Sequence, residues 1–118
     1  MGKFMIYHNP RCSKSRQALE ILKENNCEVE IVEYLKHPLS RKNFENLYAK
    51  LSSSDREKIL RTKEADYKQL LSEGAKLKTV SDLYDAIEKF PKILERPIVS
   101  TDKSAVIGRP PENIKSLF

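Results

Sequence analysis

Residues 3–16 read KFMIYHNPRCSKSR, and the architecture can be built outward from this segment. Its first five residues are mostly apolar, which predicts a short buried strand. The loop after this strand contains Pro10, which disfavours helical geometry at the residue before it. Apolar residues at helical spacing then predict a helix over Ser13–Asn25. Cys12 therefore falls between the end of a strand and the first turn of a helix.

This position favours a reactive thiol at Cys12. The first N–H groups of a helix have no partner inside the helix and attract negative charge, and cysteines there commonly have a lowered pKa. Before Glu20 the chain has no acidic residue and four basic ones, Lys3, Arg11, Lys14 and Arg16. A small buried cysteine is the alternative interpretation of any single Cys, but the strand–loop–helix position favours a nucleophilic thiolate.

Two polar side chains join Cys12 as candidate site residues. Ser15 lies three residues further along, where its hydroxyl can turn toward the sulfur, and His8 lies across the same loop. The second cysteine, Cys27, is about 20 Å away if a helix separates the two, whereas a disulfide needs Cα atoms within about 7 Å. Cys27 is therefore interpreted as structural. Because the motif starting at Cys12 is C-x-x-S, an oxidised Cys12 needs an external thiol for its reduction.

The rest of the chain is predicted to form a strand, a group of helices, two further strands and a final helix. Alternating polar and apolar residues predict a strand over Glu28–Tyr34, and a strand–helix–strand unit favours parallel pairing. The middle is expected to be helical, with segments over Ser40–Leu51, from Ser54-Asp55 to Arg61, over Glu64–Leu71, and over Thr79–Phe90 behind a Thr79-x-x-Asp82 capping box. The last elements are expected to be a hairpin of Ile98-Val99 with Ala105–Ile107, and a short helix from Pro110-Pro111 to Leu117-Phe118.

This order, β-α-β, helices, β-β-α, is that of an α/β thioredoxin-like fold. We expect a four-stranded mixed sheet with a central helical insertion. The length of 118 residues fits one domain. Its thioredoxin-like core is expected over 1–35 and 92–118, and its helical insertion over about 40–90.

Composition excludes several classes of protein. Hydrophobic residues make up 39% and charged residues 33%, as in a globular domain rather than a disordered chain. The net charge is +5, but basic residues are spread over both halves without an aromatic platform, which argues against nucleic-acid binding. No apolar run approaches the roughly 20 residues of a membrane span, and no signal peptide is apparent. We therefore expect no membrane contact and a cytoplasmic, monomeric protein.

Two kinds of site are also excluded by spacing. A cysteine phosphatase loop, C-x5-R, needs an arginine at position 18, which is Ala18. Zinc ligands are not expected either, because the available side chains lack structural-zinc spacing; these are His8, Cys12, Cys27 and His37.

Several separated segments resemble the glutaredoxin-coupled arsenate reductases of the ArsC family. The segments are residues 7–16 (YHNPRCSKSR), Tyr34-Leu35 with Pro38, Leu60-Arg61-Thr62 with Tyr67, Glu95-Arg96-Pro97-Ile98-Val99, and Ala105-Val106-Ile107-Gly108-Arg109-Pro110. The likeness covers about residues 4–118, and the length is similar to that of the short family members. It implies the same thioredoxin-like fold with a helical insertion.

The resemblance also implies roles for particular residues. The family's nucleophile falls on Cys12. Its oxyanion-binding arginines fall on Arg61, Arg96 and Arg109. His8 falls on a position that influences the thiolate, and Ser15 on a position that hydrogen-bonds it. The family has a cis proline after its second arginine, so the Arg96-Pro97 bond is expected to be cis.

Three arginines at a helix N-terminus suit the chemistry of arsenate. A guanidinium stays protonated and binds the oxygens of a tetrahedral oxyanion through a planar fork, and a helix N-terminus is itself an anion site. Arg96 and Arg109 each precede a proline beside a predicted strand. Arg61 lies among charged neighbours, so a solvated surface charge is its simplest alternative.

The implied activity is a redox cycle that uses external thiols. The Cys12 thiolate attacks arsenate or a similar oxyanion, glutathione releases arsenite and forms a mixed disulfide with Cys12, and glutaredoxin removes that glutathione. Glutathione is a co-substrate in this cycle, and no metal or bound cofactor is implied. Two alternatives stay open: a redox-responsive regulator of the Spx group, which binds RNA polymerase, and a glutathione-dependent thiol oxidoreductase without arsenate activity. Spx proteins typically carry C-x-x-C and lack the H-N-P loop, unlike this chain.

Overall fold

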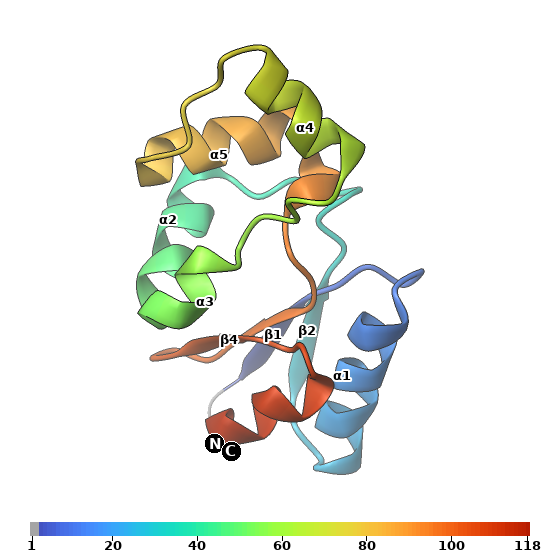
Figure 1. Ribbon diagram of the computed structural model, residues 1–118. Coiled ribbons are helices and arrows are strands. Elements are labelled where there is room, and N and C mark those ends of the chain that lie inside the picture. The colour runs from blue at the N-terminus through green and yellow to red at the C-terminus, as the bar shows by residue number, and fades with distance from the viewer. Residues whose placement is uncertain (1–2) are drawn as a thin grey trace.

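The computed structural model describes residues 3–118 and shows a four-stranded sheet with helices on both faces (Figure 1). The strands are β1 (Phe4–Tyr7), β2 (Val29–Val32), β3 (Ile98–Ser100) and β4 (Ala105–Ile107). The helices are α1 (Ser13–Glu24), α2 (Arg41–Lys50), α3 (Ser53–Glu57), α4 (Ala65–Ser72) and α5 (Val80–Lys89), with 3-10 helices η1 (Pro91–Ile93) and η2 (Pro111–Leu117). The predicted α/β thioredoxin-like order is confirmed. Within residues 3–118, no helix is both long and apolar enough to cross a membrane.

The sheet has the strand order β2-β1-β3-β4 and is mixed, as predicted. β1 and β2 are parallel, with Tyr7 opposite Val32, and α1 forms the crossover that parallel neighbours require. β3 is antiparallel to β1, and β4 is antiparallel to β3, which confirms the hairpin. The ends of β1, β2 and β4 therefore meet the beginning of β3 at one edge of the sheet.

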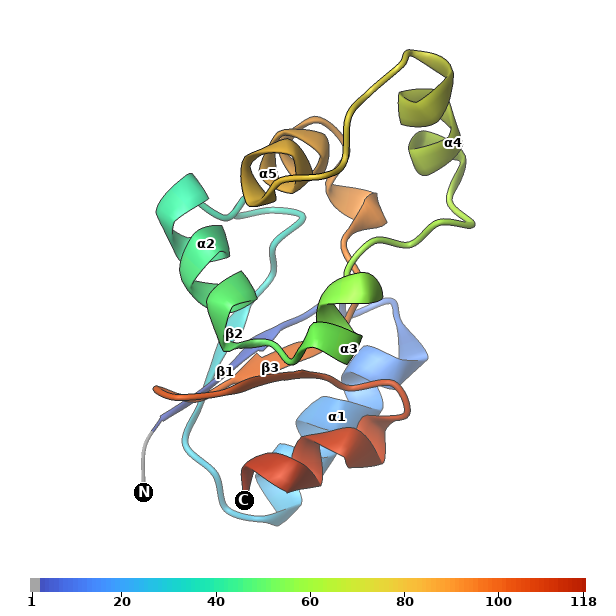
Figure 2. The same ribbon diagram turned by 60° about the vertical axis from the view of Figure 1, so that its left-hand side comes forward.

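The two faces of the sheet are covered by different parts of the chain. Figures 1 and 2 show α1 and η2 together on one face, and the helices α2 to α5 on the other. Each face has its own core, and the two can be told apart at β3. Ile98 and Val99 are both fully buried, at 0% exposure, but Ile98 packs with the insertion and Val99 packs with α1 and η2. Successive residues of a strand point to opposite faces, which explains this division.

Polar caps begin two of the insertion helices where the sequence predicts them. The Ser40 hydroxyl accepts a hydrogen bond from the Asn43 N–H at the start of α2. Thr79 and Asp82 form the predicted capping box of α5. Each cap satisfies backbone donors that have no partner within the first turn of a helix.

α3 differs from the prediction at both ends. It is capped by Ser52 rather than beginning at Ser54, and it ends at Glu57 rather than near Arg61. The chain after it runs beside residues 93–95 instead, where Leu60 and Leu94 form an isolated antiparallel bridge. This pairing is a long-range contact, which local sequence pattern does not reveal.

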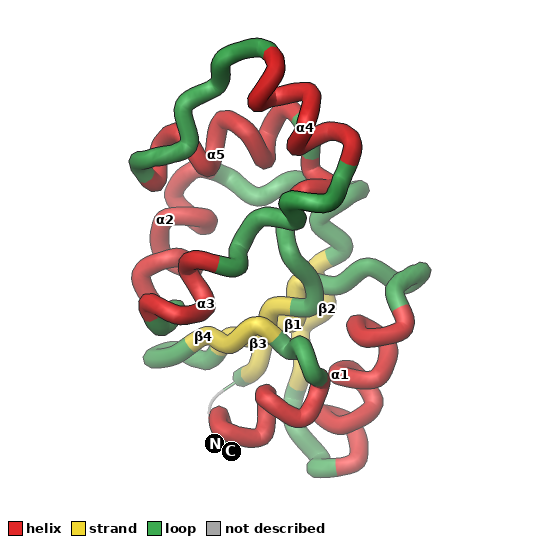
Figure 3. Tube along the Cα trace, in the orientation of Figure 1, coloured by secondary structure: helices red, strands yellow, loops and turns green. Residues whose placement is uncertain are grey.

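The strand β2 also differs from its prediction, whereas the C-terminal helix agrees with it. β2 is shorter than the predicted Glu28–Tyr34 and contains no buried residue; Ile31 keeps 46% exposure. It is an edge strand, paired with β1 alone, whereas the covering helices pack mainly over the central strands. The C-terminal segment forms the predicted short helix, as the 3-10 helix η2, which Figure 3 draws in red at the C-terminus.

The strands β3 and β4 are each flanked by a cis proline bond. Arg96-Pro97 is cis, as predicted, and Arg109-Pro110 is cis as well, which the sequence analysis did not predict. Between them, the Gly108 N–H donates to the Pro97 carbonyl over 2.8 Å. A Cβ on Gly108 would lie only 2.9 Å from Pro97 Cγ, so glycine permits the close approach of these two segments.

Candidate active site

The loops at one edge of the sheet bring together the ends of segments that are far apart in sequence. Cys12 follows β1, and Arg96 precedes the antiparallel strand β3. Arg109 follows β4, two residues beyond Ile107, which pairs with Ile98. The sheet topology therefore places Cys12, Arg96 and Arg109 at the same edge.

Cys12 is the N-cap residue of α1 and is half-buried. Its burial raises the pKa of the thiol, but this effect is outweighed by the groups around the sulfur. The backbone N–H groups of Ser15 and Lys14 point at it, and the guanidinium groups of Arg96 and Arg109 stabilise its negative charge. Together they hold the pKa of Cys12 below its ordinary value. The N-terminus of the helix acts here as the sequence predicts.

Arg109 makes the direct contact with the nucleophile. Its Nη2 donates to Cys12 Sγ over 3.3 Å, and its Nε donates to the Arg96 carbonyl over 2.8 Å. Its Nε also lies 3.1 Å from the Glu95 carboxylate. One side of the guanidinium is thus held by residues 95–96, while the other side faces the sulfur. These contacts fix the orientation of the Arg109 side chain.

Arg61 lies in a different place from Arg96 and Arg109. The structure pairs its Nη1 with the Glu95 carboxylate at 2.8 Å and its Nε with Glu64 at 3.3 Å, and gives it no hydrogen bond to the Cys12 sulfur. The bridge of Leu60 and Leu94 is what brings it beside residue 95. Arg61 is therefore joined to the site through Glu95 and not directly, which differs from the expected convergence of all three arginines.

Glu95 is a site residue that the sequence analysis did not single out. Its Oε1 accepts hydrogen bonds from Arg61 Nη1 and from the Arg96 backbone N–H, at 2.8 and 3.0 Å. The same oxygen faces Arg109 Nε. A single carboxylate thus holds two arginines in fixed positions. Its position directly before Arg96, in a segment that resembles the family, could have indicated a role in the site. Which arginines it binds depends on the tertiary structure.

The His8 and Ser15 side chains bind each other. Ser15 Oγ lies 2.6 Å from His8 Nδ1 and accepts from the Asn9 N–H at 3.1 Å. The hydroxyl has one proton and two lone pairs, so it can either donate to Nδ1 or accept from it, depending on the imidazole tautomer. Burial lowers the pKa of His8, with help from Arg16 and Lys23 and against Glu33, so the neutral ring is favoured.

The expectation that the Ser15 hydroxyl turns toward the sulfur is wrong. Ser15 is fully buried at 0% exposure and its hydroxyl is bound to His8 and Asn9, so the sulfur receives the Ser15 backbone N–H instead. The physical reason is that the His8 ring, buried behind the loop, needs a hydrogen-bond partner for its inner nitrogen. Ser15 and His8 therefore shape the loop that carries Cys12.

Replacing Ser15 with alanine should destabilise the fold and leave the acidity of Cys12 nearly unchanged. The change removes both hydrogen bonds of a buried hydroxyl and costs about 1–3 kcal/mol of folding free energy, while the backbone N–H at the sulfur remains. Urea unfolding measures the first effect, and the pH dependence of Cys12 alkylation measures the second. A large rise in the Cys12 pKa without a loss of stability would assign the hydroxyl to the sulfur after all.

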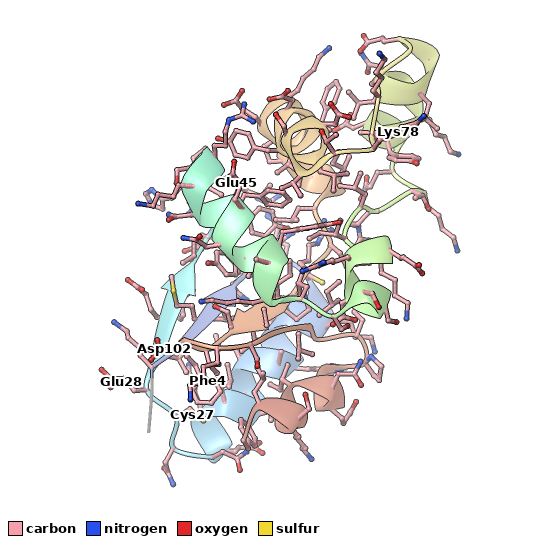
Figure 4. All side chains as sticks on the ribbon, turned by 90° about the vertical axis from the view of Figure 1, so that its left-hand side faces the viewer. Phe4, Cys27, Glu28, Glu45, Lys78 and Asp102 are labelled. Carbon is pink, nitrogen blue, oxygen red and sulfur yellow. The ribbon has the colours of Figure 1, made fainter. Side chains whose placement is uncertain are left out.

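Cys27 lies at the opposite end of α1 from Cys12. Figure 4 shows it beside Phe4, and it packs at the edge of the core formed with α1 and η2. Both cysteines are free thiols, and burial raises the pKa of Cys27. The two cysteines therefore have opposite pKa shifts in the same molecule. Within residues 3–118, no group of three His, Cys, Asp or Glu side chains is placed to hold a metal ion.

An open cleft of about 590 Å³ lies beside the arginines. Arg61, Glu95 and Arg109 line it, and the rest of the lining comes from the last residue of α3 and the segment after it: Glu57, Lys58, Leu60, Thr62, Lys63 and Glu64. The lining includes Arg109, whose guanidinium contacts the Cys12 sulfur, so the cleft lies next to the nucleophile.

Comparisons with known proteins agree on one family. The model of the ArsC family matches residues 7–117. A Neisseria meningitidis protein named arsenate reductase is 38% identical over 118 residues, covering 100% of both chains. The Escherichia coli protein YfgD, named as uncharacterized, is 43% identical over 92% of this chain and 91% of its own. The solved structure of an arsenate reductase from Vibrio cholerae superposes with a TM-score of 0.87 at 34% identity, covering 99% of this chain and 98% of that one.

Proposed function

Because the chain belongs to the ArsC family, we propose that it is an arsenate reductase that uses the Cys12 thiolate as its nucleophile and glutathione with glutaredoxin as its source of electrons. The observation that carries the proposal is the contact between Arg109 Nη2 and Cys12 Sγ at 3.3 Å. A guanidinium at that distance stabilises a thiolate and is also positioned to bind the oxyanion that the thiolate attacks.

The first proposed step forms a covalent bond between sulfur and arsenic. The Cys12 thiolate attacks arsenic(V), a sulfur–arsenic bond forms, and a hydroxide or water leaves. Arg96 and Arg109 stabilise the negative charge on the remaining oxygens. Since both guanidinium groups are already held beside the sulfur, little reorganisation is required when the substrate binds.

The second proposed step reduces the arsenic. Glutathione attacks the Cys12 sulfur, a disulfide forms between the two sulfurs, and the electron pair of the sulfur–arsenic bond stays on arsenic, which leaves as arsenite. The cleft beside Arg109 supports this step, because about 590 Å³ gives a tripeptide thiol room to approach. Glutaredoxin then removes the glutathione by thiol–disulfide exchange, which restores the Cys12 thiol. Such a cycle requires reducing thiols, so we also propose a cytoplasmic location.

A coupled assay tests the proposal. Arsenate-dependent oxidation of NADPH is measured with glutathione, glutathione reductase and glutaredoxin, and each component is then omitted in turn. We expect turnover that depends on arsenate, glutathione and glutaredoxin together. Thioredoxin with its reductase is the matched control for the electron donor, and full turnover with thioredoxin alone would contradict the proposed donor.

The same preparation separates the proposal from the two other functions considered. Reduction of a glutathione mixed disulfide without any turnover of arsenate would favour a thiol oxidoreductase. Specific retention of RNA polymerase on the immobilised protein, again without arsenate turnover, would favour a regulator of the Spx group.

A further inference from the structure

Two buried polar atoms near the nucleophile lack a hydrogen-bond partner. Among the side chains of residues 3–118, these are Tyr34 Oη and Arg96 Nε. Tyr34 as a whole is 2% exposed, and its ring packs into the core that faces the insertion. The Tyr34 hydroxyl and the Arg96 side chain lie close enough to interact with each other. A guanidinium only donates, so the hydroxyl proton still needs an acceptor, and buried polar groups nearly always have their partners.

Both atoms lie at the same sheet edge as Cys12. Tyr34 comes two residues after β2, just as the loop of Cys12 comes after the parallel strand β1, and Arg96 comes two residues before β3. The Tyr34 hydroxyl faces the Arg96 guanidinium, and Cys12 and Arg61 are both near enough to act on its charge.

A count of donors and acceptors shows which kind of partner is needed. The guanidinium groups around the hydroxyl, those of Arg96 and Arg61, supply donors only. Tyr34 Oη can accept from Arg96 Nε, but its own proton then still needs an acceptor. Burial raises the pKa of Tyr34 to about 12, so the proton is retained in the working pH range. The missing partner is therefore an acceptor, and an anion is the acceptor that the neighbouring Arg96 guanidinium attracts.

We propose that Tyr34 is a substrate-binding residue, whose hydroxyl donates a hydrogen bond to an oxygen of the tetrahedral oxyanion held between Cys12 and Arg96. This inference rests on the proposed function, because it takes an oxyanion as the substrate. Arg96 and Arg109 supply the charge, and Tyr34 supplies a neutral donor at a fixed place on the rigid core. Apolar packing holds the Tyr34 ring in place. The hydroxyl therefore keeps its position in the free protein although its proton has no acceptor there.

The test is the replacement Tyr34→Phe, made alone and in the Cys12→Ser background. Removing a buried hydroxyl whose proton has no acceptor should leave the melting temperature unchanged or raised. Arsenate binding to the Cys12→Ser protein, measured by calorimetry, should weaken about tenfold or more when Tyr34→Phe is added. Inorganic sulfate, used as a second tetrahedral probe, should lose affinity in the same direction.

Tyr84→Phe is the matched control, because Tyr84 is a buried tyrosine of the same core whose hydroxyl has a partner. It donates to the Leu39 carbonyl over 2.9 Å. We expect the opposite pattern for Tyr84→Phe, with a lower melting temperature and unchanged arsenate affinity. Equal arsenate affinity with and without Tyr34→Phe would overturn the inference and leave the proposed function standing. Failure of the Cys12→Ser protein to bind any oxyanion would overturn both.

Discussion

Arsenate reduction should be lost when Cys12 is replaced with serine and retained when Cys27 is replaced with serine. A serine hydroxyl is a far weaker nucleophile than a thiolate, and its oxygen cannot form the mixed disulfide with glutathione. We therefore expect turnover to fall by a factor of about 10³ or more. Cys27 lies at the other end of α1, away from the arginines, and its thiol is not held in the charged form. The coupled assay measures both variants.

The same two variants also measure the acidity of each thiol separately. The groups around Cys12 lower its pKa, whereas burial raises the pKa of Cys27. A lower pKa gives more thiolate at a given pH, so alkylation of Cys12 in the Cys27→Ser protein should reach half its maximal rate at a lower pH than alkylation of Cys27 in the Cys12→Ser protein. If the two pH values were equal or in the reverse order, Cys12 would not be the more acidic thiol, which contradicts the proposed mechanism.

Replacing Arg109 with alanine should have the second largest effect. The change removes the donor at 3.3 Å from the sulfur, which raises the pKa of Cys12, and it also removes one charge from the proposed oxyanion site. For the loss of such a donor we expect kcat/KM for arsenate to fall about 10²–10³-fold. Arg109→Lys should not restore activity, because one ammonium cannot reach the sulfur, the Arg96 carbonyl and Glu95 together.

Arg41→Ala is the matched control for the loss of an arginine. Arg41 belongs to α2 and pairs with Asp85 of α5 at 2.8 Å, both of them on the insertion. Its replacement should leave kcat/KM and the alkylation profile unchanged. If Arg109→Ala behaved like Arg41→Ala in both measurements, Arg109 would have no part in the chemistry.

The start of the chain shows how much of the site could be predicted locally. The strand over residues 4–7, the helix that begins after Cys12 and the effect of that helix on the thiol all depend on neighbours in sequence, and all were predicted. Arg96 and Arg109 were predicted to join Cys12 from the resembling segments, and the hairpin of β3 and β4 brings them there.

The details that were missed all depend on side-chain partners. The Ser15 hydroxyl was assigned to the sulfur, but a histidine buried seven residues earlier competes for it. Arg61 was expected at the nucleophile, but the pairing of Leu60 with Leu94 delivers it to Glu95 instead. The ring of Tyr34 packs in the core, while its hydroxyl is one of the two buried atoms described above, which no sequence pattern indicates.

The amino-acid sequence alone determined the order of strands and helices, the helix N-terminus at Cys12 and the basic character of the loop around it, because these follow from periodicity, caps and charges within a few residues. The tertiary structure alone decided which carboxylate holds which arginine, which hydroxyl is left without a partner, and which guanidinium contacts the sulfur. These depend on distances between side chains that are up to 97 residues apart in the chain, and such distances exist only once the sheet has brought the loops to one edge.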